Sequence, residues 1–276
     1  MGKATQIKTG AREFVRHVSD NRGIVLASVC AIVFVTLLEN VLAEENMKLD
    51  AAAWWLIGEH LRQPWLTPIM ESFSASEHLT PVSLELGGKC PCIVDETADI
   101  KIAAKRIVWG KLLNAGQTCV SIDYIVAHRS VKDALIAAIQ DEIARRYPCA
   151  ATNDSYPKII NERHYRRLLD LIQTEEDVIG GESNDSDRKI APAIFPHADF
   201  GHEIMKEEIF GPLIPVIEYQ DIESVIGTIK QLEKPLACYV FSQSDAQANR
   251  IIQSLSFGGG CVNDAIMHFT NHHLPF

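Results

Sequence analysis

From residue 77 onward, short apolar runs alternate with longer stretches of helical periodicity, and this alternation constrains the fold more than any other feature of the chain. Strands that alternate with helices predict a parallel sheet with helices on both faces, which is a parallel three-layer αβα domain of the α/β class. Right-handed crossovers would bring the strand ends to one edge of that sheet. The expected strands are 82–86, 92–94, 123–128, 190–194, 213–219, 237–241 and 261–263, and the expected helices are 100–113, 132–146, 162–173, 221–232 and 245–255.

Three further segments have structural interpretations. The polar segment 180–189 is rich in Asp and Ser, which is typical of a surface loop. The helix 162–173 carries Arg163, Arg166 and Arg167 on a basic face, and such a face is usually solvated. Three glycines at 258–260 are followed by neither a lysine nor a helix start, so we interpret them as a close backbone approach in an active-site wall rather than as a phosphate loop.

The string NAGQTCV at 114–120 contains a cysteine in an unusual local setting. Gly116 and Gln117 break the helical run, and Val120 is expected to start a strand. Cys119 would then lie on a helix-to-strand turn, with its backbone N–H outside the helical hydrogen-bond ladder. A thiolate readily attacks a carbonyl carbon, and an adjacent N–H can bind the oxyanion that forms. The pattern indicates a nucleophile, with a small buried apolar residue as the alternative interpretation.

A carboxylate lies inside the apolar strand 82–86. Alternation places Ser83 and Glu85 on one face of this strand, so a half-exposed strand is one interpretation. The other interpretation is catalytic. A cysteine that forms a thioester needs a base to activate the hydrolytic water, and a partly desolvated glutamate suits that task.

The strings LELGGK at 84–89, NAGQTCV at 114–120 and EEIFGP at 207–212, in this order and at these spacings, resemble the aldehyde dehydrogenase superfamily. The longer strings DIKIAAKRIVWGKLLNAGQTCV, KIINERHYRRLL and SFGGGCVNDAIMH are most similar to its class 3 and fatty aldehyde dehydrogenase branch. The resemblance covers about residues 77–276 and implies the αβα catalytic domain of that family.

The resemblance also implies a reaction and the residues that carry it. Cys119 would be the nucleophile, and Glu85 the base that activates water for deacylation. An aldehyde, apolar in the branch resembled, would be oxidised to a carboxylic acid through a thiohemiacetal and then a thioester on the cysteine. The residues placed against the cofactor, NAD or NADP, are Glu208 at the nicotinamide ribose, Phe210 as a wall beside the nicotinamide, Leu86 and Gly87.

Family members carry a long segment before the LELGG strand, with a first cofactor-binding βαβ set and an asparagine of the oxyanion hole. They also continue past the point where this sequence ends, with a tail that joins subunits into homo-oligomers. Residues 1–76 contain none of the earlier motifs. We therefore expect a truncated catalytic domain with impaired turnover and without the tail for assembly.

Residues 23–43 form a long apolar run after a basic segment, 1–22. About twenty helical residues rise about 30 Å, the thickness of the hydrocarbon core of a bilayer. We therefore expect a single transmembrane helix at 23–43, followed by a helical interfacial linker at 44–76 with Trp54, Trp55 and Trp65. A buried soluble helix and a signal peptide are the alternatives.

The two parts of the chain give conflicting indications of location. Basic residues before the apolar run favour a cytoplasmic N-terminus, which would put the remainder on the opposite side of the membrane. A nicotinamide-dependent enzyme with reduced thiols instead belongs in the cytoplasm. The head also weakly resembles the opening of the PAP2 lipid phosphatases, whose basic and histidine motifs are absent. We expect a junction near 74–77 that arose by fusion or from a gene-model artefact.

Composition excludes several other function classes. The net charge of −10 and the lack of a basic stripe argue against nucleic-acid binding. The seven cysteines form no paired framework, which favours reduced thiols. Cys90-Pro-Cys92 has only one intervening residue, and the histidines near the C-terminus lack a carboxylate partner at a set spacing, so we expect no metal site. These histidines are His268, His272 and His273.

Two further functions remain open at this level. A catalytically silent, membrane-anchored module would bind partners through an exposed sheet edge. A cofactor-independent thiol esterase would need only Cys119 and Glu85, because forming and hydrolysing a thioester requires no hydride acceptor. Titration with dinucleotide tests the first alternative, and hydrolysis of a p-nitrophenyl ester tests the second.

Overall fold

A mostly parallel sheet runs through the residues that the computed structural model describes, 88–271. Its strand order is β3-β6-β7-β2-β1-β8-β9, and every neighbouring pair is parallel except β3 with β6. A separate antiparallel hairpin pairs β4 with β5. The strands are β1 (Pro91–Val94), β2 (Tyr124–His128), β3 (Ile179–Gly180), β4 (Ser183–Asn184), β5 (Lys189–Ile190), β6 (Ala193–Ala198), β7 (Leu213–Tyr219), β8 (Ala237–Phe241) and β9 (Gly259–Val262).

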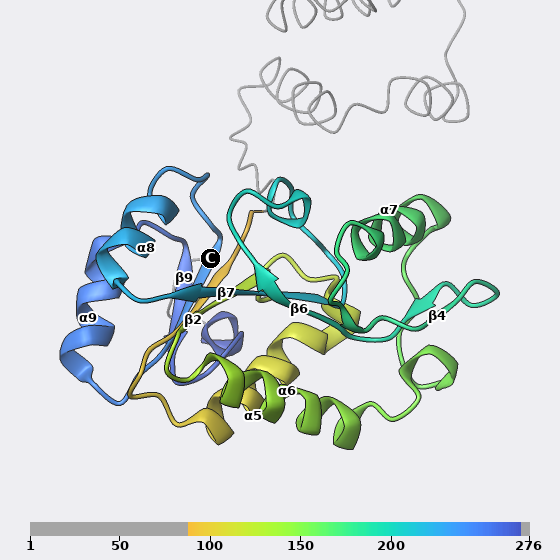
Figure 1. Ribbon diagram of the computed structural model, residues 1–276, viewed down its shortest axis with the longest axis horizontal. Coiled ribbons are helices and arrows are strands. Elements are labelled where there is room, and N and C mark those ends of the chain that lie inside the picture. The colour runs from red at the N-terminus through yellow and green to blue at the C-terminus, as the bar shows by residue number, and fades with distance from the viewer. Residues whose placement is uncertain (1–87, 272–276) are drawn as a thin grey trace, which may run out of the picture. The chain divides into compact units, whose positions relative to one another are not determined.

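Helices cover both faces of the sheet, which gives the expected three layers (Figure 1). One face packs against α5 (Ile100–Leu112) and α6 (Lys132–Arg146). The other packs against α7 (Glu162–Gln173), α8 (Ile222–Ile229) and α9 (Asp245–Ser254). Short 3₁₀ segments complete the described part: η1 (Leu113–Gly116), η2 (Ala150–Thr152), η3 (Glu203–Met205) and η4 (Met267–Thr270).

The central strands are apolar on both sides because both of their faces are covered. All four residues of β1 are buried. Cys92 packs in the cluster with α5 and α6, whereas its neighbour Ile93 packs in the cluster with α7, α8 and α9. Alternation along each strand thus divides one apolar run between two cores.

Side-chain caps explain where the helices begin. The carboxylate of Asp99 accepts a hydrogen bond from the backbone N–H of Ile102 at 3.0 Å, and α5 starts directly after it. Asn161 caps α7 in the same way through the N–H of His164, also at 3.0 Å. Each cap satisfies one of the backbone donors that a helix start leaves without an intrahelical partner. The helix boundaries predicted from sequence are confirmed to within a few residues.

Two predicted segments differ from the structure. The segment 180–189 is a surface loop only in part, because Ser183 pairs with Ile190 in the hairpin of β4 and β5. The expected strand 190–194 is therefore wrong. Ile190 is used in that hairpin and Pro192 has no N–H to donate, so the main-sheet strand β6 starts at Ala193.

The structure confirms the close backbone approach predicted for the glycines at 258–260. A Cβ on Gly260 would lie 2.1 Å from the carbonyl oxygen of Cys238, and one on Gly258 would lie 2.6 Å from that of Leu236. Only glycine lets β9 lie this close to β8.

Several predictions concern residues outside the described range. The strand 82–86, the transmembrane helix 23–43, the linker 44–76 and the junction near 74–77 all belong to this group. Within 88–271, none of the helices combines the length and the apolar character needed to cross a bilayer.

Candidate active site

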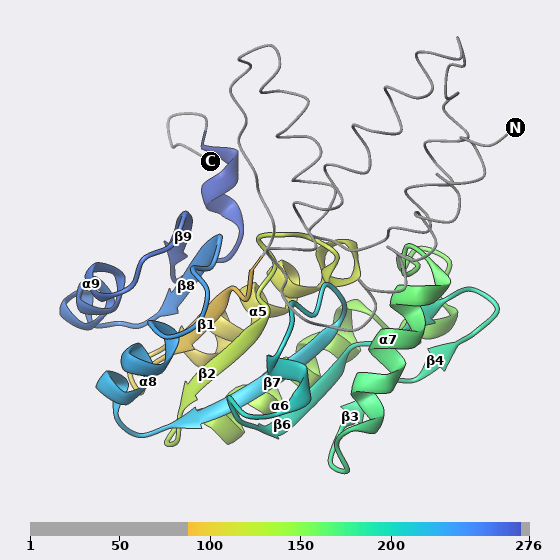
Figure 2. The same cartoon turned by 90° about the horizontal axis from the view of Figure 1, so that it is seen from above.

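The amino ends of three neighbouring strands meet at one edge of the sheet. Lys89 and Cys90 directly precede β1, Asp123 directly precedes β2, and the segment 207–212 directly precedes β7. Because β7, β2 and β1 are adjacent and parallel, these segments gather at the same edge (Figure 2). Open parallel sheets more often place their ligands at the carboxyl edge. In this chain the residues of the candidate site lie at the opposite edge.

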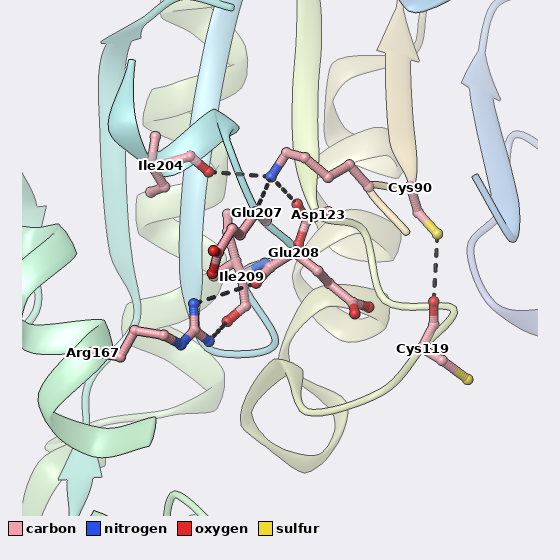
Figure 3. A network of polar contacts seen from close by, with 9 residues as sticks. Cys90, Cys119, Asp123, Arg167, Ile204, Glu207, Glu208 and Ile209 are labelled. Atoms are coloured by element: carbon pink, nitrogen blue, oxygen red, sulfur yellow. Dashed lines mark hydrogen bonds and ion pairs between the residues drawn. The ribbon is translucent and has the colours of Figure 1, made fainter. Parts of the chain in front are cut away.

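A buried ion pair joins two of these segments (Figure 3). Lys89 Nζ pairs with the carboxylate of Asp123, and the two side chains are 12% and 5% exposed. Lys89 Nζ also donates to the carbonyl oxygens of Ile204 at 3.1 Å and Glu207 at 2.8 Å. Asp123 Oδ1 accepts from the N–H of Ile209 at 2.9 Å. The pair thus holds the segment before β7 against the starts of β1 and β2.

Arg167 holds the same segment from the α7 side. Its guanidinium donates to the carbonyl oxygens of Glu208, at 3.3 Å, and of Ile209. The expected solvated basic face is therefore wrong for Arg167, although Arg163 and Arg166 are exposed. Arg167 directly precedes the buried Leu168, so its side chain lies at the edge of the core. Backbone carbonyls in such a place need hydrogen-bond donors, and the guanidinium supplies them.

The two adjacent glutamates of this segment point in different directions. Glu207 lines an open cleft of about 220 Å³ between α7 and η3. Glu208 is half-buried, and its carboxylate extends toward the loop that carries Cys119 (Figure 3). Phe210 is half-buried with a left-handed φ of 48°. The contacts of Arg167 and Asp123 fix the backbone that presents the latter two side chains.

Cys119 lies within a loop between η1 and β2. The predicted strand 123–128 is confirmed to within one residue, because β2 begins at Tyr124, whereas the expectation that Val120 starts a strand is wrong. Asn114, Ala115 and Gly116 have left-handed φ values of 52°, 54° and 76°, which end the helical run. Left-handed backbone cannot continue a right-handed helix. Cys119 itself is half-buried.

Gln117 anchors this loop to the segment before α7. Its side-chain N–H₂ donates to the carbonyl oxygens of Asn114 and Lys158, both at 3.0 Å. Its side-chain oxygen accepts from the N–H of Ile160 at 2.9 Å. The residue is buried, so these three bonds replace water that cannot reach it.

The loops of Cys119 and Glu208 are in backbone contact. A Cβ on Gly116 would lie 2.2 Å from the carbonyl oxygen of Gly211. Glycine at this position allows the approach as well as the left-handed φ. The strings NAGQTCV and EEIFGP, at least 87 positions apart in sequence, therefore form one structural unit.

A buried lysine lies behind this unit. Lys111, in the last turn of α5, is 1% exposed, and its Nζ has no hydrogen-bond partner in the described part of the chain. Desolvation lowers its pKa to about 8, while the nearby Asp123 acts in the opposite direction. Lys89, Cys90 and Glu208 also influence this pKa, so the ammonium lies among the charges of the site.

The structure brings together some of the predicted site residues. Cys119, Glu208 and Phe210 lie on two touching loops. Glu85, Leu86 and Gly87 lie outside the described residues, so their relation to Cys119 stays a prediction. The residues that sequence reasoning missed are Lys89, Lys111, Gln117, Asp123 and Arg167. Four of these are charged groups beside apolar elements, and that placement is a signal that they are at least partly buried.

The cysteine pair is part of the core. Cys90 and Cys92 are both fully buried, and burial raises the pKa of both thiols. Within residues 88–271, no group of three His, Cys, Asp or Glu side chains is arranged to hold a metal ion.

Comparison with known proteins connects this arrangement to a family. The model described as "Aldehyde dehydrogenase family" matches residues 67–276. The 4,4'-diaponeurosporen-aldehyde dehydrogenase of Staphylococcus aureus is 47% identical over 206 residues, which are 74% of this chain and 45% of that protein. Aldehyde dehydrogenase family 3 member A2 of Rattus norvegicus is 42% identical over 75% of this chain and 43% of its own length.

A solved structure shows the same fold. The substrate-bound state of Staphylococcus aureus AldH superposes with a TM-score of 0.73 at 44% sequence identity, covering 78% of this chain and 47% of that one. Fold and comparisons together define a three-layer α/β domain of the kind found in aldehyde dehydrogenases. The chain belongs to the aldehyde dehydrogenase family. It spans about half the length of the curated relatives that it matches.

Proposed function

We propose that this chain carries the nucleophile half of an aldehyde dehydrogenase, which oxidises an apolar aldehyde to a carboxylic acid with NAD or NADP. The observation that supports this most is the contact between Gly116 and Gly211, which joins the loop of Cys119 to the loop of Glu208. A thiol and a carboxylate from distant parts of the sequence thereby share one edge of the sheet.

The residues of this edge suit the nicotinamide end of a dinucleotide. Glu208 offers a half-buried carboxylate, which can accept hydrogen bonds from ribose hydroxyls. Phe210 offers a half-buried ring on the same rigidly held segment. Leu86 and Gly87 would complete this contact. When bound, the dinucleotide accepts the hydride that leaves the substrate carbon.

The chain's own residues perform the covalent steps. The Cys119 thiolate adds to the aldehyde carbon and forms a carbon–sulfur bond, and the carbonyl oxygen becomes an alkoxide. Loss of hydride from that carbon converts the thiohemiacetal into a thioester. Glu85 takes a proton from water, and the hydroxide attacks the thioester. The carbon–sulfur bond breaks, which releases the carboxylic acid and restores the thiolate.

Membrane attachment belongs to the same proposal. Residues 23–43 would cross the bilayer once, and the linker 44–76 would lie at its interface. The catalytic part would face the cytoplasm, where its cofactor and reduced thiols belong. The likeness of the head to PAP2 lipid phosphatases stays a prediction.

The experiment compares two reactions in the full chain and in three variants. Aldehyde oxidation is followed by absorbance of the reduced dinucleotide, and p-nitrophenyl ester hydrolysis is followed without dinucleotide. We expect Cys119→Ala to abolish both reactions and Glu85→Gln to leave a burst followed by slow turnover, since acylation survives and deacylation does not. Cys149→Ala is the matched control and should change neither reaction, because Cys149 is an exposed thiol that takes no part in the proposed chemistry.

Each outcome of this experiment decides between functions. Aldehyde oxidation that persists in Cys119→Ala would contradict the proposal. Ester hydrolysis that needs Cys119, with no aldehyde oxidation at saturating NAD or NADP, would favour the thiol esterase instead. Absence of both reactions would favour a silent module.

A further inference from the structure

We propose that Cys90 and Tyr239 are positioning residues, which hold the loop of Cys119 from the sheet side and thereby set the direction of its thiol. This inference rests on the proposed function, in which Cys119 is the nucleophile. It assigns a role to two core side chains that take no part in the chemistry described above.

The two side chains donate hydrogen bonds to consecutive backbone carbonyls of the loop. Cys90 Sγ donates to the carbonyl oxygen of Cys119 at 3.5 Å (Figure 3). Tyr239 Oη, from β8, donates to the carbonyl oxygen of Val120 at 2.5 Å. Cys90 and Tyr239 are both 0% exposed. Both donors therefore lie in the core, away from solvent.

Cys90 is itself held in place by the sheet. The N–H of Ala237, the first residue of β8, donates to Cys90 Sγ at 3.3 Å. Burial raises the pKa of the Cys90 thiol to about 12, so the thiol keeps its proton and remains a donor throughout the neutral range. A chain of hydrogen bonds thus runs from β8 through the thiol to the loop.

These contacts determine where the Cys119 side chain can point. The loop from Gln117 to Asp123 has no strand or helix of its own, so its peptide planes depend on such contacts. With the carbonyl of Cys119 drawn toward Cys90, the thiol of Cys119 points away from Cys90 (Figure 3). The hydrogen bond from Tyr239 to the carbonyl of Val120 keeps the next peptide plane from rotating, so the Cys119 thiol keeps its direction.

The test measures the rate at which iodoacetamide labels Cys119 in the full chain, with peptide mass spectrometry to distinguish Cys119 from the other cysteines. The rate is measured at increasing pH until it no longer rises, and this maximum is the plateau rate. We expect Cys90→Ala and Tyr239→Phe each to lower the plateau rate by about threefold to tenfold, because each removes one buried hydrogen bond from the loop. Cys90→Ser keeps a donor and should recover most of the rate.

Matched controls separate positioning from general loosening of the core. Cys92→Ala removes the same sulfur two residues further along, from an equally buried position. Tyr219→Phe removes a buried hydroxyl that has no hydrogen-bond partner among the described residues, at the far end of β7. Both controls should leave the Cys119 rate unchanged even where they shift the unfolding midpoint.

The inference is wrong if Cys90→Ala and Tyr239→Phe leave the rate within experimental error, or if the controls lower it equally. Should Cys90→Ala fail to fold, Tyr239→Phe decides alone. A wild-type Cys119 that labels quickly, with no effect of the variants, would remove this inference and leave the proposed function intact. A wild-type Cys119 that labels no faster than Cys149 would remove both.

Discussion

Asp123 Oδ1 accepts a hydrogen bond from the backbone N–H of Ile209 at 2.9 Å, across 86 positions of sequence. The same carboxylate pairs with Lys89, whose ammonium donates to two carbonyls of the segment that leads to Ile209. One buried ion pair therefore determines the position of the segment that presents Glu208 and Phe210.

Removing this carboxylate should destabilise the domain strongly. We expect Asp123→Ala to lower the free energy of unfolding by about 3 kcal/mol or more, because Lys89 would remain buried without its partner. The measurement is urea denaturation. Glu223→Ala is the control, since Glu223 and its partner Arg250 are both 54% exposed. Its loss should lower the free energy of unfolding by about 1 kcal/mol at most, and equal effects of the two variants would contradict the role of Asp123.

The contact between the two loops can be tested at one glycine. Gly116→Ala would place a methyl group 2.2 Å from the Gly211 carbonyl oxygen, at a φ of +76° that alanine disfavours. We expect a lower unfolding midpoint and slower labelling of Cys119, because both loops must shift. Gly227→Ala, in α8, meets nothing within 4 Å and should raise stability by about 0.5 to 1 kcal/mol. A neutral Gly116→Ala would show that the loops do not touch as described.

Lys111 gives a pH-dependent prediction. Its pKa falls from 10.5 to about 8 in the folded chain, mainly by desolvation. Below about pH 8 the folded state carries a buried charge, at a penalty of about 3 kcal/mol. As pH rises from about 8 to 10.5, the folded state loses this proton before the unfolded state does, so the penalty disappears and stability rises.

Lys111→Met removes the charge and keeps much of the side-chain volume. We expect the variant to be more stable than the wild type at neutral pH, and this advantage to shrink above about pH 8. Lys105→Met, at an exposed position of the same helix, should follow the wild type at every pH. An advantage that does not change with pH would show that Lys111 is not a charged buried group.

The sequence predicts the layers of this fold well because apolar periodicity alone carries that information. Strand β7 and helices α6 and α7 match their predicted ranges. Errors occur where tertiary contacts override local pattern. Val120 looks like the start of a strand, but its carbonyl is taken by Tyr239 and the strand starts only at Tyr124.

In the candidate site, too, local sequence predicts some residues, and tertiary contacts decide the others. The strings around Cys119 and Glu208 predict both as site residues, whereas nothing local reveals that Arg167 reaches the backbone of the Glu208 segment. A helical arginine looks the same in sequence whether its guanidinium meets water or a carbonyl. Lys89 and Asp123 are 34 positions apart, so their pairing depends on the parallel register of β1 and β2.

The most direct test of this account is the relative rate of alkylation of Cys119 and Cys149 in the unmodified chain at neutral pH. Cys149 is exposed and Cys119 only half-buried, so access alone would make Cys149 react first. We predict that Cys119 reacts faster by about tenfold or more, as an activated thiolate does. A Cys119 that reacts at the rate of Cys149 or more slowly would contradict its role as the nucleophile.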